Sequence, residues 1–325
     1  MKEFDKRMRE LQSQYKTATL GITAQGKWKS TKYPHILPEG KWDLNLWDSI
    51  RKEAQFYFND NNIAWHKYKH NLLSSQVMCV NIFFPLKKHL DVLEPWLSSY
   101  FNNVGNVVDL DFEYIGPEGK DYFNENGGRG QNRTSSDVSI TWLDKAKRKN
   151  MLLLEFKFTE SSFGECGKKG NPDRSRCLSS NKVVASPQTQ CYRAEVGRTY
   201  WDIIPTNESP LRKERLTADG YCPFRYDFYQ LMRNQLLAHC IQADSEAGLH
   251  RVEFGVIYHA DNDKLLRMSH SFDGERNPLK AWRSMLKNPD PFHYFAVQDL
   301  ISTIEERLPD GLIEWRTYLK QRYGL

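Results

Sequence analysis

The apolar residues of this chain recur with two different periods, and each period predicts one type of secondary structure. Apolar residues spaced three to four apart predict a helix, whereas alternation or a short continuous apolar run predicts a strand. Helical spacing is found over residues 4–16, 44–59, 72–86, 226–243, 296–308 and about 312–322. The strand pattern is found over residues 107–115, 137–143, 151–158 and 252–260. The third of these strands is apolar enough to lie in the centre of a sheet.

The order of these elements predicts an α/β fold with three parts along the chain. Residues 1–43 form a basic N-terminal arm and an irregular connection that contains glycine and proline. Residues 44–260 contain all four predicted strands and the helices that precede and separate them, and we expect this part to be the core. Within it, a loop-rich insert at 159–226 separates the third strand from the next helix. Residues 261–325 are expected to form a helical extension packed on the core.

The net charge of +5 is concentrated at the beginning of the chain. Residues 1–41 contain nine Lys and Arg against four Asp and Glu, a difference of 9 − 4 = 5, so the remainder is formally neutral. A nucleic-acid-binding surface must therefore come from local clusters of charge, and a solvated arm explains the basic excess equally well. The chain has no apolar run of about 18 residues and no secretory signal at its start, so we expect a cytoplasmic protein without a membrane span.

The candidate chemistry lies on the second and third strands. Asp137 begins the second strand, and Glu155 and Lys157 stand near the end of the third. Residues two apart on a strand point to the same face, so Glu155 and Lys157 point together and Phe156 points away. A hairpin between the two strands would bring Asp137 beside them. Two carboxylates and an ammonium group suit a divalent-metal site for phosphodiester hydrolysis, although an exposed Glu–Lys pair on an edge strand is the simpler alternative.

This pattern resembles the signature of the PD-(D/E)xK nuclease superfamily, which has a restriction-endonuclease-like core. The match consists of Asp137, a variable gap and then Glu155-Phe156-Lys157, with Ser136 in place of the proline. The order of elements over residues 62–260 also matches the αβββαβ order of that core, which contains a mixed central sheet. The resemblance implies Mg²⁺ or Mn²⁺ held by Asp137, Glu155 and the carbonyl of Phe156, with Lys157 stabilising charge or orienting water.

The resemblance also implies two further site residues. An acid from an earlier element often joins the metal site in this superfamily, and Glu113, near the end of the first strand, is the candidate. Asp109 and Asp111 share its alternating face, so the choice among the three stays open. A glutamine early in the helix after the third strand can reach the site, which here is Gln230. A rival is Gln188 with Tyr192, which resembles the QxxxY motif of RecB-like nucleases but lies in a poorer helix. A solvated strand face and a surface glutamine remain the simpler alternatives.

Six cysteines pose a second question. Cys79 and Cys240 lie on apolar helical faces and are expected to pack in the core. The four cysteines of the insert are Cys166, Cys177, Cys191 and Cys222. Four cysteines in a segment without a clear hydrophobic pattern are compatible with Zn²⁺ or an iron–sulfur cluster that helps the segment to fold. No CxxC occurs among them, so unliganded cysteines are the alternative.

Four short segments also resemble a bacterial family of restriction-endonuclease-like nucleases. They are LLSSQVMCVNIFFPL, FEYIGPEG, TSSDVSI and YQLMRNQLLA. Together these resemblances imply a metal-dependent nuclease, most simply an endonuclease, that hydrolyses DNA in defence or DNA processing. RNA remains open as a substrate, and a homodimer is possible. The alternatives are a nucleic-acid-binding protein of the same fold without activity, and an interaction module stabilised by metal at the cysteines.

Overall fold

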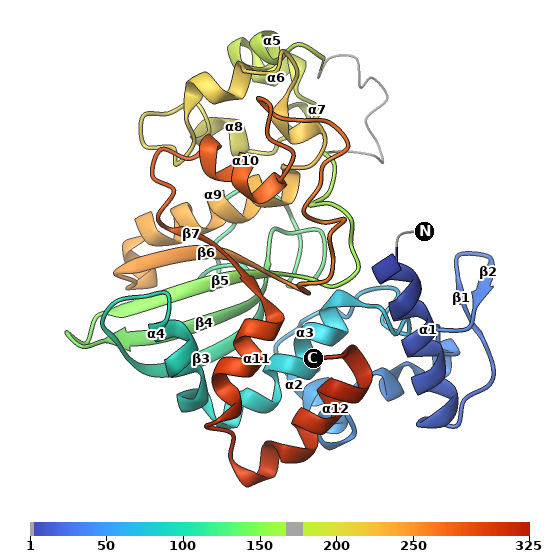
Figure 1. Ribbon diagram of the computed structural model, residues 1–325. Coiled ribbons are helices and arrows are strands. Elements are labelled where there is room, and N and C mark those ends of the chain that lie inside the picture. Colours follow the sequence, from blue (N-terminus) through green and yellow to red (C-terminus); the bar gives the residue numbers. More distant parts are fainter. Residues whose placement is uncertain (1–2, 167–177) are drawn as a thin grey trace.

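The computed structural model describes residues 3–166 and 178–325, and its centre is a five-stranded sheet with helices on both faces (Figure 1). The helices are α1 (Glu3–Ala18), α2 (Arg51–Asp60), α3 (Ser75–Phe83), α4 (Glu94–Ser98), α5 (Ser180–Ala185), α6 (Pro187–Gln190), α7 (Tyr192–Glu195), α8 (Tyr200–Ile203), α9 (Tyr229–Ala243), α10 (Pro278–Met285), α11 (Val297–Glu305) and α12 (Ile313–Tyr323). The strands are β1 (Gly26–Trp28), β2 (Thr31–Tyr33), β3 (Val104–Tyr114), β4 (Ser136–Asp144), β5 (Lys149–Lys157), β6 (Arg251–Tyr258) and β7 (Phe292–Ala296).

The central sheet is mixed, with strand order β3-β4-β5-β6-β7. Strands β3, β4 and β5 form an antiparallel meander, whereas β6 is parallel to β5 and β7 is parallel to β6. Strand β5 lies in the middle, and each of its residues from Asn150 to Lys157 is buried. The α/β class and the mixed central sheet predicted from the sequence are confirmed.

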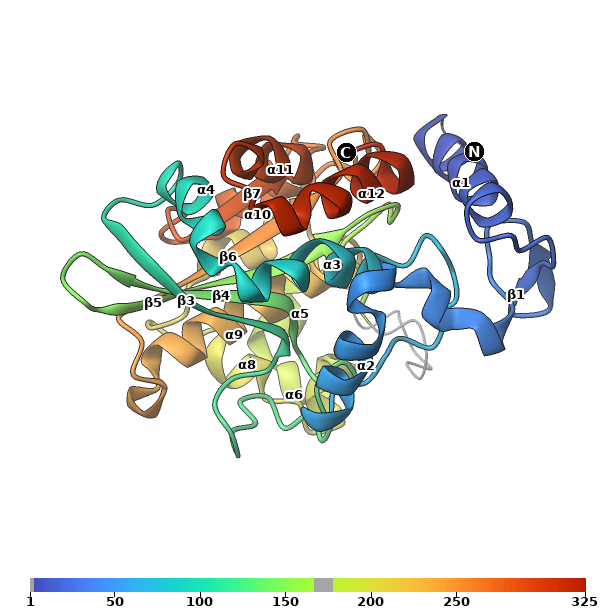
Figure 2. The ribbon, with the colours of Figure 1, turned by 90° about the horizontal axis from the view of Figure 1, so that it is seen from below.

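The two faces of the sheet carry separate hydrophobic clusters. Side chains such as Leu152 and Leu154 of β5 join the cluster that contains α3, α11 and α12. The intervening Leu153 joins the other cluster, with α9 and α10. Figures 1 and 2 show these two groups of helices on opposite faces of the sheet. The alternation along β5 therefore produces two layers of helices around one sheet.

The insert packs its apolar side chains into the hydrophobic cluster that contains α9, contrary to what its sequence pattern suggested. Its described residues form short helices, and Val183, Trp201, Ile204 and Leu216 are buried in the same cluster as α9. The pattern was hard to recognise because these apolar residues come from helices of four to six residues, too short for a period to be visible. Burial of this apolar surface contributes to the stability of the insert without any metal.

The N-terminal region is folded against the other end of the chain. Helix α1 packs on α12, where the buried guanidinium of Arg322 donates to Gln12 Oε1 over 2.7 Å and to Asn45 Oδ1. After α1, the chain forms a two-stranded hairpin, β1–β2, within the segment that the sequence indicated to be irregular. The basic N-terminal residues are thus held on the molecule by a buried polar network.

Two other elements differ from the sequence pattern. The expected helix at 44–59 begins only at Arg51, because Leu46 is extended and the backbone N–H of Trp47 donates to Asn81 instead of continuing a helix. Strand β7 was not predicted, because its five residues, FHYFA, show neither a clear alternation nor a purely apolar run. It lies within the expected C-terminal helical extension and adds the fifth strand to the sheet.

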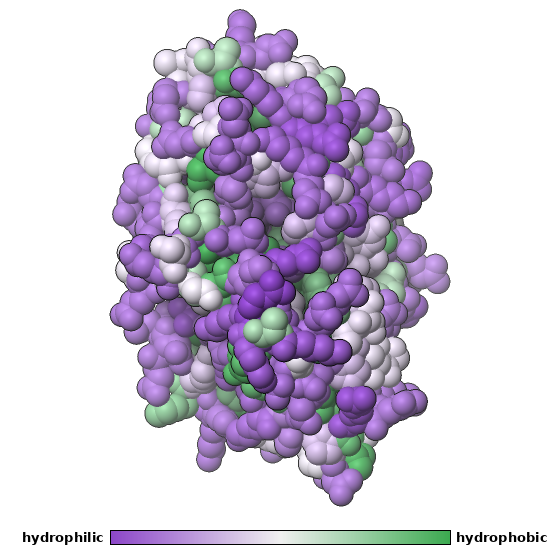
Figure 3. Space-filling view, turned by 90° about the vertical axis from the view of Figure 1, so that its left-hand side faces the viewer, coloured by the Kyte–Doolittle hydropathy of each residue, from purple (hydrophilic) through white to green (hydrophobic). Residues whose placement is uncertain are grey.

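The surface offers no large hydrophobic face on the side of the β4–β5 turn. Figure 3 shows hydrophilic residues over most of that side, with hydrophobic residues in small separate areas. Among the described residues, no helix combines the length and the apolar character needed to cross a membrane.

Candidate active site

Three carboxylates stand in one row across neighbouring strands. In the β3–β4 ladder, Glu113 and Asp137 lie between the pairs Phe112–Val138 and Tyr114–Ser136, and so face each other. In the β4–β5 ladder, Val138 pairs with Leu154, so the next position brings Asp137 opposite Glu155. Directly opposite residues of antiparallel strands are neighbours on the same face. Register alone therefore brings together the three acids that the sequence indicated.

The buried end of this row contains a tightly held ion pair. Lys157 Nζ lies 2.7 Å from Glu155 Oε1, and the two side chains are 6% and 7% exposed. Asn234 of α9 donates to Glu155 Oε2 over 2.6 Å, and Lys157 also donates to Gln230 Oε1 over 2.8 Å. Beside them, Asp137 Oδ2 accepts the backbone N–H of Phe156 over 2.6 Å. The sequence-predicted trio is thus assembled at one end of β4 and β5.

Glu113 lies at the end of β3, where the backbone departs from regular strand geometry. Its φ of +48° lies in the left-handed region, where a residue other than glycine is strained. The side chain is buried, and its two oxygens accept from Gln76 Nε2 over 2.7 Å and from Ser135 Oγ over 2.6 Å. Of the three acids on β3, Asp109 is exposed and Asp111 pairs with Tyr57 and Arg129. Of these three acids, therefore, only Glu113 belongs to the carboxylate row.

The proximity of the carboxylates changes their proton affinities. Burial raises the pKa of Asp137 well above its ordinary value, and the charges of Glu155 and Glu113 add to the effect. Burial likewise raises the pKa of Glu113, despite its hydrogen bonds from Ser135 and Gln76. Burial alone would lower the pKa of Lys157, but the charges of Glu155, Glu160 and Asp137 together outweigh it and the pKa is raised. The site thus holds more negative charge than one lysine neutralises, and it favours a cation.

Helix α9 supplies a polar edge to the site. Gln230 and Asn234 are one turn apart, so both point toward β5, where they bind Lys157 and Glu155. Gln188 and Tyr192 belong to two different short helices, α6 and α7, and neither borders the cavity that Asp137, Glu155 and Lys157 line. The rival QxxxY motif is therefore not part of this site.

Three contributing residues were not singled out from the sequence. Gln76 and Ser135 bind Glu113, and Asn234 binds Glu155. Gln76 and Asn234 both lie on largely buried helices, and a polar residue at a buried helical position is a signal that could have been used. Ser135 has no comparable signal, because it lies in a polar loop.

The carboxylate row borders a cavity of about 720 Å³ that extends from these acids to the N-terminal hairpin. Asp137, Glu155 and Lys157 line its inner part, and Arg9, Trp28 and Tyr68 line it nearer the N-terminal region. The site is therefore open to a substrate larger than water, and it combines acidic, basic and aromatic groups.

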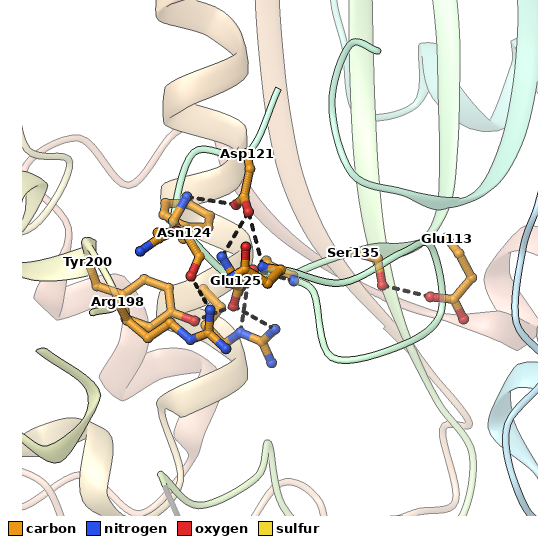
Figure 4. A network of polar contacts seen from close by, with 11 residues as sticks. Glu113, Asp121, Asn124, Glu125, Ser135, Arg198 and Tyr200 are labelled. Carbon is orange, nitrogen blue, oxygen red and sulfur yellow. Dashed lines mark hydrogen bonds and ion pairs between the residues drawn. The ribbon is translucent and has the colours of Figure 1, made fainter. Parts of the chain in front are cut away.

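The loop between β3 and β4 is tied to both the insert and α9. Figure 4 shows Glu125 at the centre of this network and the Ser135–Glu113 contact beside it. Glu125 accepts from the backbone N–H and the hydroxyl of Thr134, from Tyr200 OH, and from Arg233 over 3.1 Å. Arg129 of this loop pairs with Asp111 and donates to the backbone carbonyls of Phe112 and Glu113.

The insert cysteines only partly come together. Cys166, Cys191 and Cys222 border one small cavity of about 20 Å³ between the insert and α9, and Cys177 lies outside the described residues. No disulfide joins any two of the described cysteines. Over residues 3–166 and 178–325, no group of three or more His, Cys, Asp or Glu side chains is arranged to hold a metal ion by itself.

The carboxylate row nevertheless fits a hard divalent cation. Mg²⁺ in nucleotide chemistry is usually bound through one or two carboxylates, with waters and substrate phosphates completing its six ligands. Asp137 uses Oδ2 to accept the backbone N–H of Phe156. Glu155 binds Lys157 through Oε1 and Asn234 through Oε2, and the two carboxylates face each other at the cavity wall. The residues present thus match a site that is completed by water and substrate, and they do not match a closed all-protein cage.

Comparison with known proteins identifies the class. A family model that covers almost the whole chain places it among the restriction-endonuclease-like proteins. The model that matches residues 9–324 is described as restriction endonuclease associating with ARP, and the chain belongs to this family. The expectation of a restriction-endonuclease-like family is thereby confirmed. No curated protein and no solved structure gave a match.

Proposed function

We propose that this protein is a metal-dependent DNA nuclease, most simply an endonuclease, whose site is the row of Glu113, Asp137 and Glu155 with Lys157. The observation that carries the proposal is the alignment of three carboxylates from three adjacent strands beside a buried lysine in one cavity. Burial of this much charge is costly, so a purely structural role is a poor explanation. Membership of a restriction-endonuclease family supports the same conclusion.

Each residue has a distinct part in the proposed reaction. Asp137 and Glu155, with the carbonyl of Phe156, would hold Mg²⁺ or Mn²⁺. The ion, when bound, supplies positive charge to the phosphate and lowers the pKa of water at the site. Lys157, which Gln230 and Glu155 hold in place, donates to the scissile phosphate as negative charge develops or orients the attacking water.

Glu113 and Asn234 are the remaining residues of the proposed site, and each acts on the metal-binding acids. Glu113 adds a third negative charge, which would favour the cation and, through Ser135, connects the site to the β3–β4 loop. Asn234 donates to Oε2 of Glu155, so that Oε1 of the same carboxylate can pair with Lys157. Both are expected to tune the site and to be less critical than Asp137 or Lys157.

The partners follow from the same proposal. DNA is the proposed substrate, and the family description makes association with ARP part of the proposed setting. A homodimer, which would cut both strands of a duplex, remains a prediction from the sequence.

The two rival functions are a binding protein without catalysis and an interaction module that depends on the insert cysteines. The assembled carboxylate row argues against the first, and the packed hydrophobic core of the insert reduces the need for the second.

Cleavage of circular and linear DNA tests the proposal. The wild type is incubated with Mg²⁺, Mn²⁺ or EDTA and compared with Asp137→Ala and Lys157→Ala. We expect cutting only with metal, and a fall of at least about 100-fold in both variants, the usual scale for loss of an electrostatic catalytic group. Loss of the closed circular form would establish endonuclease action.

Lys88→Ala is the matched control. Lys88 is an exposed lysine paired with Glu53 and does not border the cavity, so its loss is expected to leave the rate unchanged. Equal cutting by the wild type, Asp137→Ala and Lys157→Ala would contradict the proposed site.

A further inference from the structure

The β1–β2 hairpin presents an exposed aromatic side chain at the catalytic cavity. Trp28 is 41% exposed, which is unusual for tryptophan, since this residue is normally largely buried. Its ring meets Tyr33 and Tyr68 edge-on, with centroid distances of 6.4 and 6.3 Å. All three rings border the same cavity as Asp137, Glu155 and Lys157. We call Trp28, Tyr33 and Tyr68 the aromatic platform.

The platform is surrounded by lysines. Lys27, Lys29 and Lys32 are exposed on the hairpin, and Lys67 is exposed beside Tyr68. Lys29 Nζ lies 4.8 Å from the ring centre of Trp28, and Lys67 Nζ lies 5.6 Å from that of Tyr68. None of these four lysines forms an ion pair with a carboxylate in the described part of the chain. Their charge is therefore available to a negatively charged ligand.

The hairpin is held firmly against the body of the protein. The buried Lys16 Nζ donates to the carbonyl of Ala24 over 2.7 Å, and His70 Nε2 lies 2.9 Å from the carbonyl oxygen of Lys27. Gly26 is so close to the backbone of Leu37 that an added Cβ would lie 1.9 Å from its carbonyl oxygen. Glycine is thus needed for this close approach, and the fixed hairpin gives the platform a defined position beside the cavity.

We infer that the aromatic platform stacks on unpaired bases, so that the nuclease takes single-stranded DNA, or an unpaired stretch of duplex, into its catalytic cavity; this inference rests on the proposed function. Aromatic side chains bind single strands because an unstacked base offers its face, whereas the bases of a regular duplex are already stacked on one another. Lysines interleaved with the rings suit the phosphates of the same strand. The basic excess of the N-terminal region then has a use at the site.

Binding without cleavage tests the platform independently of catalysis. Fluorescence anisotropy in EDTA measures the affinity of the full-length protein for a labelled (dT)20 strand and for a 20-base-pair duplex. We expect the single strand to bind more tightly, and Trp28→Ala and Tyr68→Ala each to weaken it by about 5- to 100-fold, the range of one lost stacking contact. Trp28→Phe should retain most of the affinity, because it keeps an aromatic face.

Phe56→Ala is the matched control, since Phe56 is an exposed aromatic residue on α2 that does not border the cavity. Thermal unfolding of each variant verifies that the fold is intact, and Tyr68→Ala keeps the test valid if Trp28→Ala is unstable. Equal affinity of wild type and both alanine variants for (dT)20 would overturn the inference, as would tighter binding of the duplex. Tighter binding of (U)20 than of (dT)20 would overturn the choice of DNA.

The binding and cleavage results together distinguish a failure of this inference from a failure of the proposed function. Platform-dependent binding of (dT)20 by a protein that never cuts DNA would support the platform and contradict the nuclease. Metal-dependent cutting that Trp28→Ala and Tyr68→Ala leave unchanged on both substrates would support the nuclease and overturn the platform.

Discussion

At the scale of single residues, the site depends on a buried charge imbalance. Glu113, Asp137 and Glu155 share one cavity with a single lysine, and burial with mutual repulsion raises the pKa of Asp137 and of Glu113. Such an arrangement costs stability in the absence of a cation. Functional sites commonly trade stability for chemistry in this way.

Asp137→Asn is therefore expected to stabilise the metal-free protein at neutral pH, by roughly 0.5–2 kcal/mol. Because the pKa of Asp137 is raised in the folded state, protonation favours folding. That stabilisation is fully present below about pH 3.9, the ordinary pKa of aspartate, and is lost as the pH rises through the raised pKa. The gain from asparagine should consequently be largest above the raised pKa and vanish at acid pH. Urea unfolding in EDTA across this pH range measures it.

The control for this prediction is Asp109→Asn, an exposed acid on the neighbouring strand. It should change the free energy of unfolding by no more than about 0.5 kcal/mol, as is usual for surface substitutions. A loss of stability in Asp137→Asn at neutral pH would mean that its hydrogen bond from Phe156 outweighs the repulsion, against the present account.

At the scale of elements, the loop between β3 and β4 connects the insert to the active site. Asp121 caps the loop internally by accepting the backbone N–H of Glu125 over 2.9 Å, and Arg198 donates to the carbonyl of Asn124. Glu125 binds Tyr200 and Arg233, while Ser135, at the end of the loop, binds Glu113 (Figure 4). One short segment thus holds contacts to three other parts of the molecule.

Glu125→Ala is expected to loosen this loop and to lower the free energy of unfolding by about 3–5 kcal/mol, because it removes one partner of a buried ion pair. Hydrogen exchange of the amides at 121–135 should become faster. Glu118→Ala, at an exposed position of the same loop, should change neither measurement. Unchanged exchange at 121–135 in Glu125→Ala would show that the loop is held by other contacts.

The helices and strands with a long, regular apolar pattern could be predicted from the sequence, and the short ones could not. Strand β5 was predicted as 151–158 and is observed as Lys149–Lys157, because a long apolar run has few alternatives. Helix α9 was likewise recognised, since its apolar positions are spaced for a helix over fifteen residues. The short helices of the insert and strand β7 could not be predicted, because tertiary packing decides the structure of segments this short.

At the scale of the whole molecule, the two ends of the chain meet and position the N-terminal hairpin. Arg322 of α12 is fully buried and binds Gln12 of α1 and Asn45, with the ring of Tyr15 over its guanidinium at 4.6 Å. Gln12 Nε2 also donates to the carbonyl of Arg322 over 2.5 Å. These contacts link residues more than 270 positions apart, and none could be inferred from local sequence pattern.

Arg322→Met is expected to cost about 1–3 kcal/mol for each buried polar group that it leaves without a partner. Arg316→Met on the same helix removes a partly exposed pair with Glu305 and should cost no more than about 1 kcal/mol. Thermal unfolding compares the two. Equal melting temperatures for both variants would show that the buried network does not hold the N-terminal region in place.

The candidate site was more predictable than its surroundings. Asp137, Glu155 and Lys157 could be placed together because strand alternation and a hairpin are local rules. Gln76 and Asn234 carried only the signal of a polar residue on an apolar helix, which does not say what they contact. The aromatic platform reaches the site through tertiary packing, which no local pattern reveals. The number of cysteines in the insert suggested a bound metal that would stabilise this segment. The insert instead packs around apolar side chains.

The most direct measurement of the central claim is calorimetric titration of Mn²⁺ into the wild type, Asp137→Asn and Asp109→Asn. It needs no knowledge of the DNA target, and it compares two acids on adjacent strands, only one of which lies in the carboxylate row. The account predicts that the wild type and Asp109→Asn bind Mn²⁺ with the same affinity and that Asp137→Asn loses this binding. Undiminished binding by Asp137→Asn would contradict the claim that the row of Glu113, Asp137 and Glu155 is the metal site.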